Sequence, residues 1–218
     1  MHMAESLVTP PKFRRRAKAR PDEVLDAALG LFAAQGYAQT SVEQIARAAG
    51  LSKGAVYLYF PSKQSLLEGL VRRAVVPVAD EALRRIADYR GDPRPLIRQV
   101  FGFLRDSLAD PAVLQVPKLV IREAVAAPDI ARMYRIEVLD RVLPAFIGLI
   151  AQAVSAGHIR PVDPELVLRC LLGPVLLHLV LAEVFAITPK GGLELDLMID
   201  THLTLLFAGL EPEKGHHD

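Results

Sequence analysis

Thr40–Lys63, which reads TSVEQIARAAGLSKGAVYLYFPSK, carries the strongest structural signal in this chain of 218 residues. Its pattern predicts two short helices joined by a tight turn. The first helix ends at Gly50, because glycine accepts the left-handed conformation that commonly ends helices. Ser52 can cap the second helix, which continues to about Tyr59 before Pro61 stops it.

Two residues can cap the first of these helices. Glu43 lies three residues after Thr40, and Gln44 lies three residues after Ser41. This is the spacing of a capping box, in which two side chains satisfy each other's backbone N–H groups. The sequence leaves open which pair forms the box.

A longer amphipathic helix is expected before this pair. Pro21 suits its first position, Asp22 and Glu23 complement its positive N-terminal end, and Gly36 ends it. Its apolar residues recur at helical spacing, at Leu25, Ala28, Leu29 and Phe32. Two short helices packed on a preceding helix and joined by a glycine-containing turn make a helix-turn-helix unit.

The two short helices have an apolar face and a polar face. The side chains that can face inward are Val42, Ile45, Ala46, Ala49, Leu51, Val56 and Phe60. This leaves Lys53, Gly54, Tyr57 and Tyr59 facing outward. Exposed tyrosines beside a lysine and a glycine offer hydrogen-bond donors with little bulk between them, which suits an approach to the major groove of DNA.

The segment from Tyr37 to Lys63 resembles the DNA-binding domain of TetR-family regulators, and the resemblance extends over about residues 22–75. It is carried by Thr40-Ser41, Ile45-Ala46, Ala49-Gly50, Ser52-Lys53-Gly54, Tyr57, Tyr59-Phe60 and Lys63-Gln64. It implies an all-α protein with an N-terminal three-helix helix-turn-helix domain, joined by a long helix to a C-terminal helical domain for ligand binding and dimerisation. It also implies a ligand-responsive repressor that binds a palindromic double-stranded DNA operator.

The resemblance implies a set of candidate DNA-binding residues: Thr40, Ser41, Ser52, Lys53, Gly54, Ala55, Tyr57, Tyr59 and Lys63. The helix from Ser52 would lie in the major groove, with Lys53 and the two residues after it close to base edges. Both tyrosines, Lys63 and Thr40 would hold phosphates. Glu43 stands where some family members carry a base-contacting basic residue, so direct base contacts from its helix are not expected.

Simpler interpretations of these residues stay open. Lys53 and Lys63 can be solvated surface lysines, and Tyr57 can belong to the core beside Val56. Gly54 can serve close packing alone. The hydroxyl groups at positions 40 and 41 are potential helix caps whatever else they contact.

Charge is unevenly distributed along the chain. The net charge is +1, but residues 1–63 hold nine Lys or Arg against five Asp or Glu, a net +4 that leaves −3 for the remainder. Six of these cations fall within residues 12–20 of a predicted flexible basic arm, 1–20. A basic front end on a mildly acidic body indicates that one small region meets a polyanion.

The rest of the chain predicts further helices. A long fourth helix begins at Ser62 and reaches Tyr89, and Pro77 can kink it. Others are expected at about 94–108, 112–126, 129–155, 164–187 and 194–209. The predicted domains are therefore a helix-turn-helix domain at 21–66, a ligand-binding and dimerisation domain at 67–210, and a flexible tail at 211–218.

Two C-terminal helices are predicted to form a homodimer interface. Residues 164–187 are apolar nearly all round, and 194–209 carry one apolar stripe at Leu195, Met198, Ile199, Leu203 and Leu206. The resemblance implies that both pair with their counterparts in a twofold four-helix interface. A core within one chain is the alternative. A membrane span is disfavoured, because Arg169, His178 and Glu183 would be costly in a bilayer.

Polar residues in apolar helices are the hints of an effector pocket. The candidates are Arg105, Arg122, Tyr134 and His178, although each can equally be an ion-paired, surface or core residue. Since the body offers mostly Leu, Val, Ile and Phe, the expected effector is small and largely apolar. Cys170 is the only cysteine, so it excludes an intramolecular disulfide and favours a cytoplasmic location. It is expected in the core.

Two other classes of function compete with this interpretation. An enzyme is disfavoured, because the chain lacks the G-x-G-x-x-G, G-x-x-x-x-G-K-[ST] and H-E-x-x-H motifs, and no cofactor or metal ion is expected. A DNA-architectural protein is disfavoured, because its body would be uniformly basic. Activation in place of repression stays open.

Overall fold

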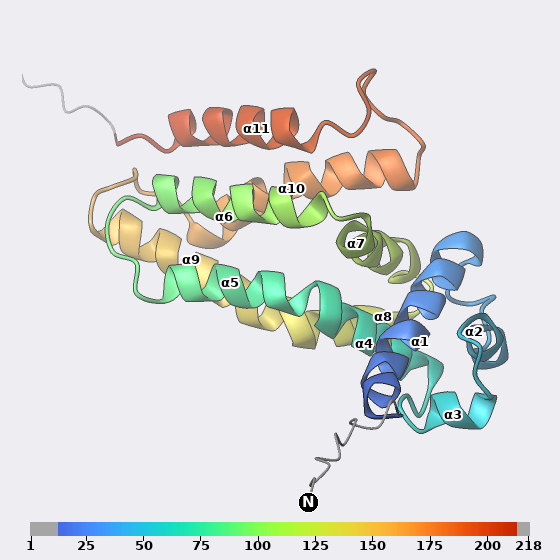
Figure 1. The fold of residues 1–218 in the computed structure, drawn as a ribbon. Coiled ribbons are helices and arrows are strands. Elements are labelled where there is room, and N and C mark those ends of the chain that lie inside the picture. The colour runs from blue at the N-terminus through green and yellow to red at the C-terminus, as the bar shows by residue number, and fades with distance from the viewer. Residues whose placement is uncertain (1–12, 213–218) are drawn as a thin grey trace, which may run out of the picture. The chain divides into compact units, whose positions relative to one another are not determined.

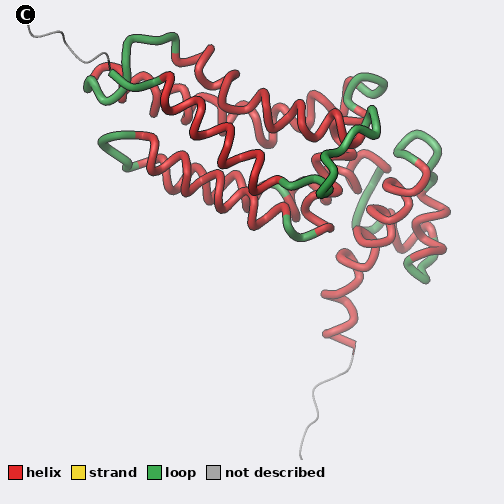
Figure 2. The backbone as a smooth tube through the Cα atoms, turned by 90° about the horizontal axis from the view of Figure 1, so that it is seen from above, coloured by secondary structure: helices red, strands yellow, loops and turns green. Residues whose placement is uncertain are grey.

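The structure, a computed structural model, describes the backbone of residues 13–212 and the side chains of residues 21–212. These residues form helices and connecting loops, with no strand among them (Figure 1, Figure 2). The elements are α1 (Phe13–Gln35), α2 (Val42–Ala48), α3 (Lys53–Tyr57), α4 (Lys63–Ala74), α5 (Val76–Ala87), α6 (Pro93–Leu108), α7 (Pro111–Glu123), α8 (Pro128–Tyr134), the π-helix η1 (Arg135–Leu139), α9 (Asp140–Ser155), α10 (Pro164–Glu183) and α11 (Leu195–Gly209). The predicted all-α fold class is confirmed.

The first helix begins earlier than the sequence predicts. Helix α1 starts at Phe13 and contains Pro21 in its interior, so the expectation of a flexible arm up to residue 20 is wrong for residues 13–20. This run is rich in Arg, Lys and Ala, which are strong helix formers. Residues 1–12 of the predicted arm and residues 213–218 of the predicted tail lie outside the described residues.

The chain divides into two compact units after Leu66. In the first unit, α2 packs against both α1 and α3. Ser41 and Gln44 form the capping box of α2: the Gln44 N–H donates to Ser41 Oγ (3.2 Å), and the Ser41 N–H donates to Gln44 Oε1 (2.7 Å). Gly50 turns the chain at φ +66°, a conformation that favours glycine.

The predicted fourth helix is two helices, because the chain breaks at Val75 between α4 and α5. The break lies two residues before Pro77. A proline has no N–H to donate to the carbonyl four residues earlier, here that of Arg73, and its ring clashes with that carbonyl. The predicted kink is therefore a helix boundary, and α5 ends at Ala87.

The second unit is a bundle in which α9 packs against α5 and α10, while α6 packs against α5, α7 and α11. The predicted helix at 129–155 is present, with the π-helical turn η1 between α8 and α9. Several helices start with proline at one of their first two positions, after a capping aspartate. At α10, for example, Asp163 Oδ1 accepts from the Glu165 N–H at 2.8 Å.

The core of this unit corrects two expectations about the last helices. Ile199 and Leu203, from the α11 stripe expected at a dimer interface, are buried in the core of the same chain, and Leu206 packs partly against it. The outward face of α11 carries other apolar residues, notably Leu197 and Leu205. Cys170, expected in the core, is exposed on α10. Apolar residues cover most of both helices, so the sequence pattern could not tell their inner faces from their outer faces.

Two helical segments are long and apolar enough to cross a membrane by length and composition alone. They are residues 128–155, which comprise α8, η1 and α9, and Pro164–Glu183, which is α10. Both contribute to the core of the second unit through residues such as Ile150 and Leu171. Core helices of soluble proteins have the same composition.

Candidate nucleic-acid interface

Helix α3 has an exposed polar face and one fully buried side chain, Val56, on its opposite face. Val56 is fully buried, while Lys53 and Gly54 are exposed, and Tyr57 and Tyr59 expose 41% and 39% of their surface. The outward orientation of these four residues is therefore confirmed. A Cβ atom added at Gly54 would meet nothing within 4 Å, so Gly54 serves no close packing and leaves this surface open.

Two hydrogen-bonding side chains predicted as DNA contacts act as caps. Ser52 Oγ accepts a hydrogen bond from the Ala55 N–H (3.2 Å) at the start of α3. In the same way, Ser41 Oγ accepts from the Gln44 N–H at the start of α2. The segment Gly50–Gly54, GLSKG, also has the letters of a G-x-S-x-G nucleophile motif. That motif places its serine on a sharp turn between a strand and a helix. Ser52 instead lies between helices α2 and α3, and its hydroxyl caps the start of α3.

Lys53 forms an ion pair across the turn. Its Nζ donates to Glu43 Oε1 of α2 and lies 5.7 Å from the centre of the Tyr57 ring. The hydrogen bond from Lys53 lowers the pKa of Glu43, and the same hydrogen bond raises the pKa of Lys53. Both groups are therefore charged at neutral pH. Sequence reasoning missed this pair, although an acid on an otherwise basic surface was a signal for it.

Lys63 is half-buried at the start of α4. Its Nζ donates to the carbonyl oxygens of Tyr37 (2.8 Å) and Ala38 (3.3 Å) and lies 4.4 Å from the centre of the Tyr37 ring. The Tyr37 ring in turn packs on Phe32. Lys63 thus ties the start of α4 to the loop before α2, a structural role that the sequence did not predict.

Thr40 differs from the expectation of a phosphate contact. Only 2% of its surface is exposed, and its hydroxyl donates to the Gly36 carbonyl (2.8 Å) while accepting from Gln35 Nε2 (3.1 Å). Both hydrogen bonds stabilise the turn between α1 and α2. The buried position argues against a phosphate contact by this hydroxyl.

The four candidate effector residues lie on different helices, α6, α7, α8 and α10. Arg105 pairs with Asp106 (2.8 Å) and with Asp196 of α11 (3.1 Å). Exposed Arg122 lies 3.4 Å from Glu123. These two arginines have carboxylate partners within the protein.

The other two candidates, His178 and Tyr134, are half-buried. His178 makes a hydrogen bond through Nε2 with the Leu193 carbonyl, which holds the loop before α11 against α10. Tyr134 is the last residue of α8, next to the π-helix, and burial raises the pKa of its phenol.

Family comparisons agree with this geometry. The model for the N-terminal domain of bacterial regulatory proteins of the tetR family matches residues 24–70, and the model for a tetracycline repressor-like C-terminal domain matches residues 86–186. The chain belongs to the TetR family. Members of this family are DNA-binding transcriptional regulators, and this chain is a TetR-family transcriptional regulator.

Individual relatives cover different parts of the chain. The regulator RutR of Escherichia coli is 30% identical over 72% of both chains. AcrR of Shigella flexneri is 33% identical over 44% of this chain, and the nucleoid occlusion factor SlmA of Haemophilus ducreyi is 40% identical over 33%. The chain spans only 45% of AcrR and 35% of SlmA.

Solved structures share the fold over most of the chain. SmeT in complex with triclosan has a TM-score of 0.73 at 25% identity, over 90% of this chain and 93% of SmeT. SmeT is the repressor of the Stenotrophomonas maltophilia multidrug efflux pump SmeDEF. FadR of Bacillus subtilis, in complex with stearoyl-CoA, has a TM-score of 0.71 at 21% identity, over 87% of this chain and 99% of the FadR chain, which shows the fold alone.

Thr40→Val should destabilise the first unit without changing its DNA-contacting surface. The substitution removes the donor to Gly36 and the acceptor for Gln35 inside a buried turn, so it should cost about 1–3 kcal/mol in the free energy of unfolding. Thermal unfolding and DNA titration well below the unfolding midpoint would measure both effects. A large loss of affinity for DNA in the folded variant would instead restore Thr40 as a DNA contact.

Proposed function

We propose that this protein is a ligand-responsive repressor that binds a palindromic operator as a homodimer and is released by a small, largely apolar effector in the cytoplasm. The observation that carries the proposal is the exposed face of α3. Lys53 and Tyr57 lie there beside the open Gly54 on a helix held by buried Val56, and Tyr59 follows just after the end of the helix. A surface of this kind fits the major groove, where phosphate donors flank a region that can approach base edges.

Within this face we propose different roles for different residues. Lys53 and its neighbours Gly54 and Ala55 lie at the start of α3 and would contact base edges. Tyr57 and Tyr59 would donate hydrogen bonds to phosphates. Lys63 adds a positive charge at the edge of this surface, although its ammonium also holds the loop before α2.

Variants of the α3 face should separate affinity from specificity. Tyr59→Phe should weaken binding to all sequences alike, because it removes a phosphate donor. Lys53→Ala should cost about 1–3 kcal/mol on the operator and relax the preference at particular base pairs. Titration of an operator selected from random-sequence duplexes, together with its single-base variants, would measure both. Footprinting adds the control: diffuse protection in place of one short palindrome would favour an architectural role.

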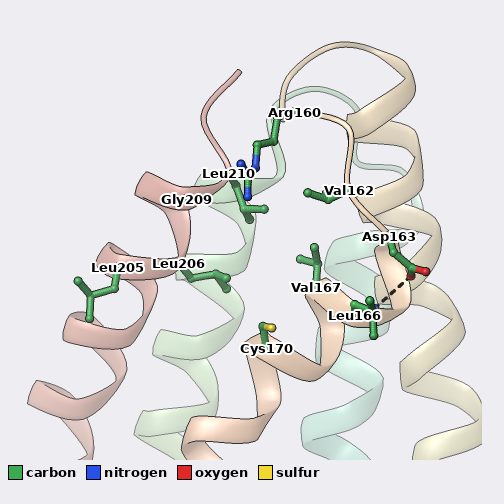
Figure 3. A pocket seen from close by; sticks show the side chains of 10 residues that line it. All are labelled: Arg160, Val162, Asp163, Leu166, Val167, Cys170, Leu205, Leu206, Gly209 and Leu210. Carbon is green, nitrogen blue, oxygen red and sulfur yellow. Dashed lines mark hydrogen bonds between the residues drawn. The ribbon is translucent and has the colours of Figure 1, made fainter. Parts of the chain in front are cut away.

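The homodimer is proposed from the outward faces of α10 and α11. Leu166 and Leu177 of α10 and Leu197 and Leu205 of α11 are large apolar residues exposed to solvent. A groove of about 360 Å³ lies between the start of α10 and the end of α11, and it is mostly apolar (Figure 3). The groove is lined by Arg160, Val162, Asp163, Leu166, Val167, Cys170, Leu205, Leu206, Gly209 and Leu210.

A second copy of the chain is the occupant that we propose for this surface. Leu166 and Leu205 line the same groove, and exposed apolar residues that lie together on a surface often mark an interaction site. Twofold pairing of the two helices would cover both faces at once and would place the two α3 helices to match a palindromic operator. Cys170 would then lie within the interface.

Leu205→Glu should convert the dimer into monomers. The side chain is 70% exposed in the single chain, so the fold tolerates a carboxylate there, but a dimer interface would bury that carboxylate without a partner. Association should weaken by at least about a hundredfold, and operator affinity should fall with it. Val125→Glu, at an exposed apolar site between α7 and α8, is the control and should sediment like the wild type. A wild-type protein that sediments as a monomer at micromolar concentration would contradict the proposal.

The effector is proposed to bind within the second unit. The helices α5, α6, α9 and α10 supply a core of Leu, Ile, Val and Phe with few polar partners, a lining that suits an apolar ligand. The similar fold of SmeT was solved with triclosan, a small molecule, which supports this proposal. Among the four predicted polar contacts, we favour Tyr134, which is half-buried at the end of α8 beside the π-helix.

Helix α4 would transmit the effect of the ligand, because it begins in the first unit and continues past Leu66 into the second. A ligand that favours a conformation in which α4 tilts would lower DNA affinity by thermodynamic linkage. A coupling of about 1–3 kcal/mol gives a five- to roughly hundredfold release.

Pro77→Ala should change this coupling more than it changes operator affinity in the absence of effector. It removes the cause of the break between α4 and α5 and leaves the DNA-contacting residues alone. Operator titrations with and without an effector, found by thermal-shift screening of small apolar compounds that include triclosan, would measure the coupling. Pro95→Ala, in the first turn of α6, is the matched control. Equal loss of affinity in both conditions would refute the role of Pro77.

A further inference from the structure

Glu43 is the only acidic residue between Thr40 and Lys63, where the charged residues are otherwise Arg47, Lys53 and Lys63. This is the segment that we propose to lie against DNA. A carboxylate facing a polyanion weakens binding to any sequence, since the phosphates repel it. The loss of DNA affinity caused by Glu43 must therefore be offset by another contribution of this side chain.

The structure places Glu43 beside Lys53. Glu43 lies in the first turn of α2, Lys53 is the first residue of α3, and the side chains meet through the hydrogen bond from Nζ to Oε1. The two side chains expose 52% and 49% of their surface, so both charged ends are accessible to a third group. An ammonium has three N–H donors and a carboxylate has about four acceptor positions. A pair joined by one hydrogen bond can thus donate and accept further hydrogen bonds.

We propose that Glu43 is a specificity-determining residue, which together with Lys53 recognises one G·C base pair in each half-site from the major groove. Lys53 donates to O6 and N7 of guanine, and Glu43 accepts from the N4 amino group of cytosine. Within the base pair, guanine O6 and cytosine N4 are hydrogen-bonded neighbours about 2.9 Å apart on the groove edge. The Lys–Glu pair has a donor and an acceptor at comparable spacing and in the complementary order. This inference rests on the proposed DNA-binding function and changes the expectation that α2 makes no base contacts.

The chemistry of the groove also determines which base pairs this ion pair rejects. A T·A pair offers thymine O4 and adenine N6 in the same order, but the thymine methyl group replaces the second acceptor, guanine N7. Inversion to C·G puts the amino group opposite Lys53 and the guanine oxygen opposite Glu43, so donor meets donor and acceptor meets acceptor. Recognition is therefore specific for both the composition and the orientation of the pair.

The pair also lowers binding to unrelated DNA. Where an A·T or C·G pair stands at this position, the carboxylate of Glu43 meets a carbonyl oxygen instead of an amino group, in addition to the phosphate repulsion that it faces on every sequence. Glu43 thus lowers the affinity for unrelated DNA and raises the ratio of specific to non-specific affinity.

The test uses the full-length protein and an operator that the wild type selects from random-sequence duplexes. Affinities for the operator, for all of its single-base-pair variants and for random DNA are measured for the wild type, Glu43→Gln and Lys53→Gln. The wild type should prefer G·C at one position of each half-site by about tenfold or more. Glu43→Gln should reduce this preference to about threefold or less and should bind random DNA more tightly. Lys53→Gln should lose the preference at the same position.

Glu23→Gln is the matched control, because it removes one exposed acid from α1 in the same unit. It should leave the base preferences unchanged at every position. The proposal is overturned if Glu43→Gln binds all sequences more tightly with the same preferences as the wild type, or if the two variants lose preference at different base pairs. A wild type that selects no consensus sequence would overturn the proposed function itself, and this inference with it.

Discussion

A helix of five residues has no stability of its own in water, and the arrangement around α3 compensates for this. Ser52 accepts from one of the unpaired N–H groups at its start, and Val56 is fully buried beneath it. Helix α2, capped by Ser41 and Gln44, packs alongside. Val56 is the only fully buried side chain of α3, so most of the other side chains of this helix remain accessible to solvent.

In the second unit, helices must provide both a core and an exposed apolar surface. Helices α10 and α11 are apolar on more than one side, and one side of each is buried in the core of its own chain. The other side, with Leu177 and Leu205, is exposed in the single chain. Core formation and association would therefore use separate faces of the same two helices.

The proposed role of the Glu43–Lys53 pair would favour selectivity over affinity. Cations alone would increase binding to every DNA sequence, because phosphates are the same everywhere. The Glu43–Lys53 pair gives up part of that uniform attraction and places an acceptor beside a donor, both half-exposed. A salt bridge at this degree of exposure contributes little to folding stability, so the fold does not depend on it.

The sequence by itself determined the helix-turn-helix, the outward residues of α3 and the starts of most later helices. These depend on caps, turns and prolines that act on residues within about four positions of each other. Only the tertiary structure decided that Thr40 is buried, that Lys63 holds the Tyr37 carbonyl and that Glu43 meets Lys53. It alone also showed which apolar face of α11 turns inward. Periodicity tells which side chains share a helix face, but the partner that covers a face comes from a distant part of the chain.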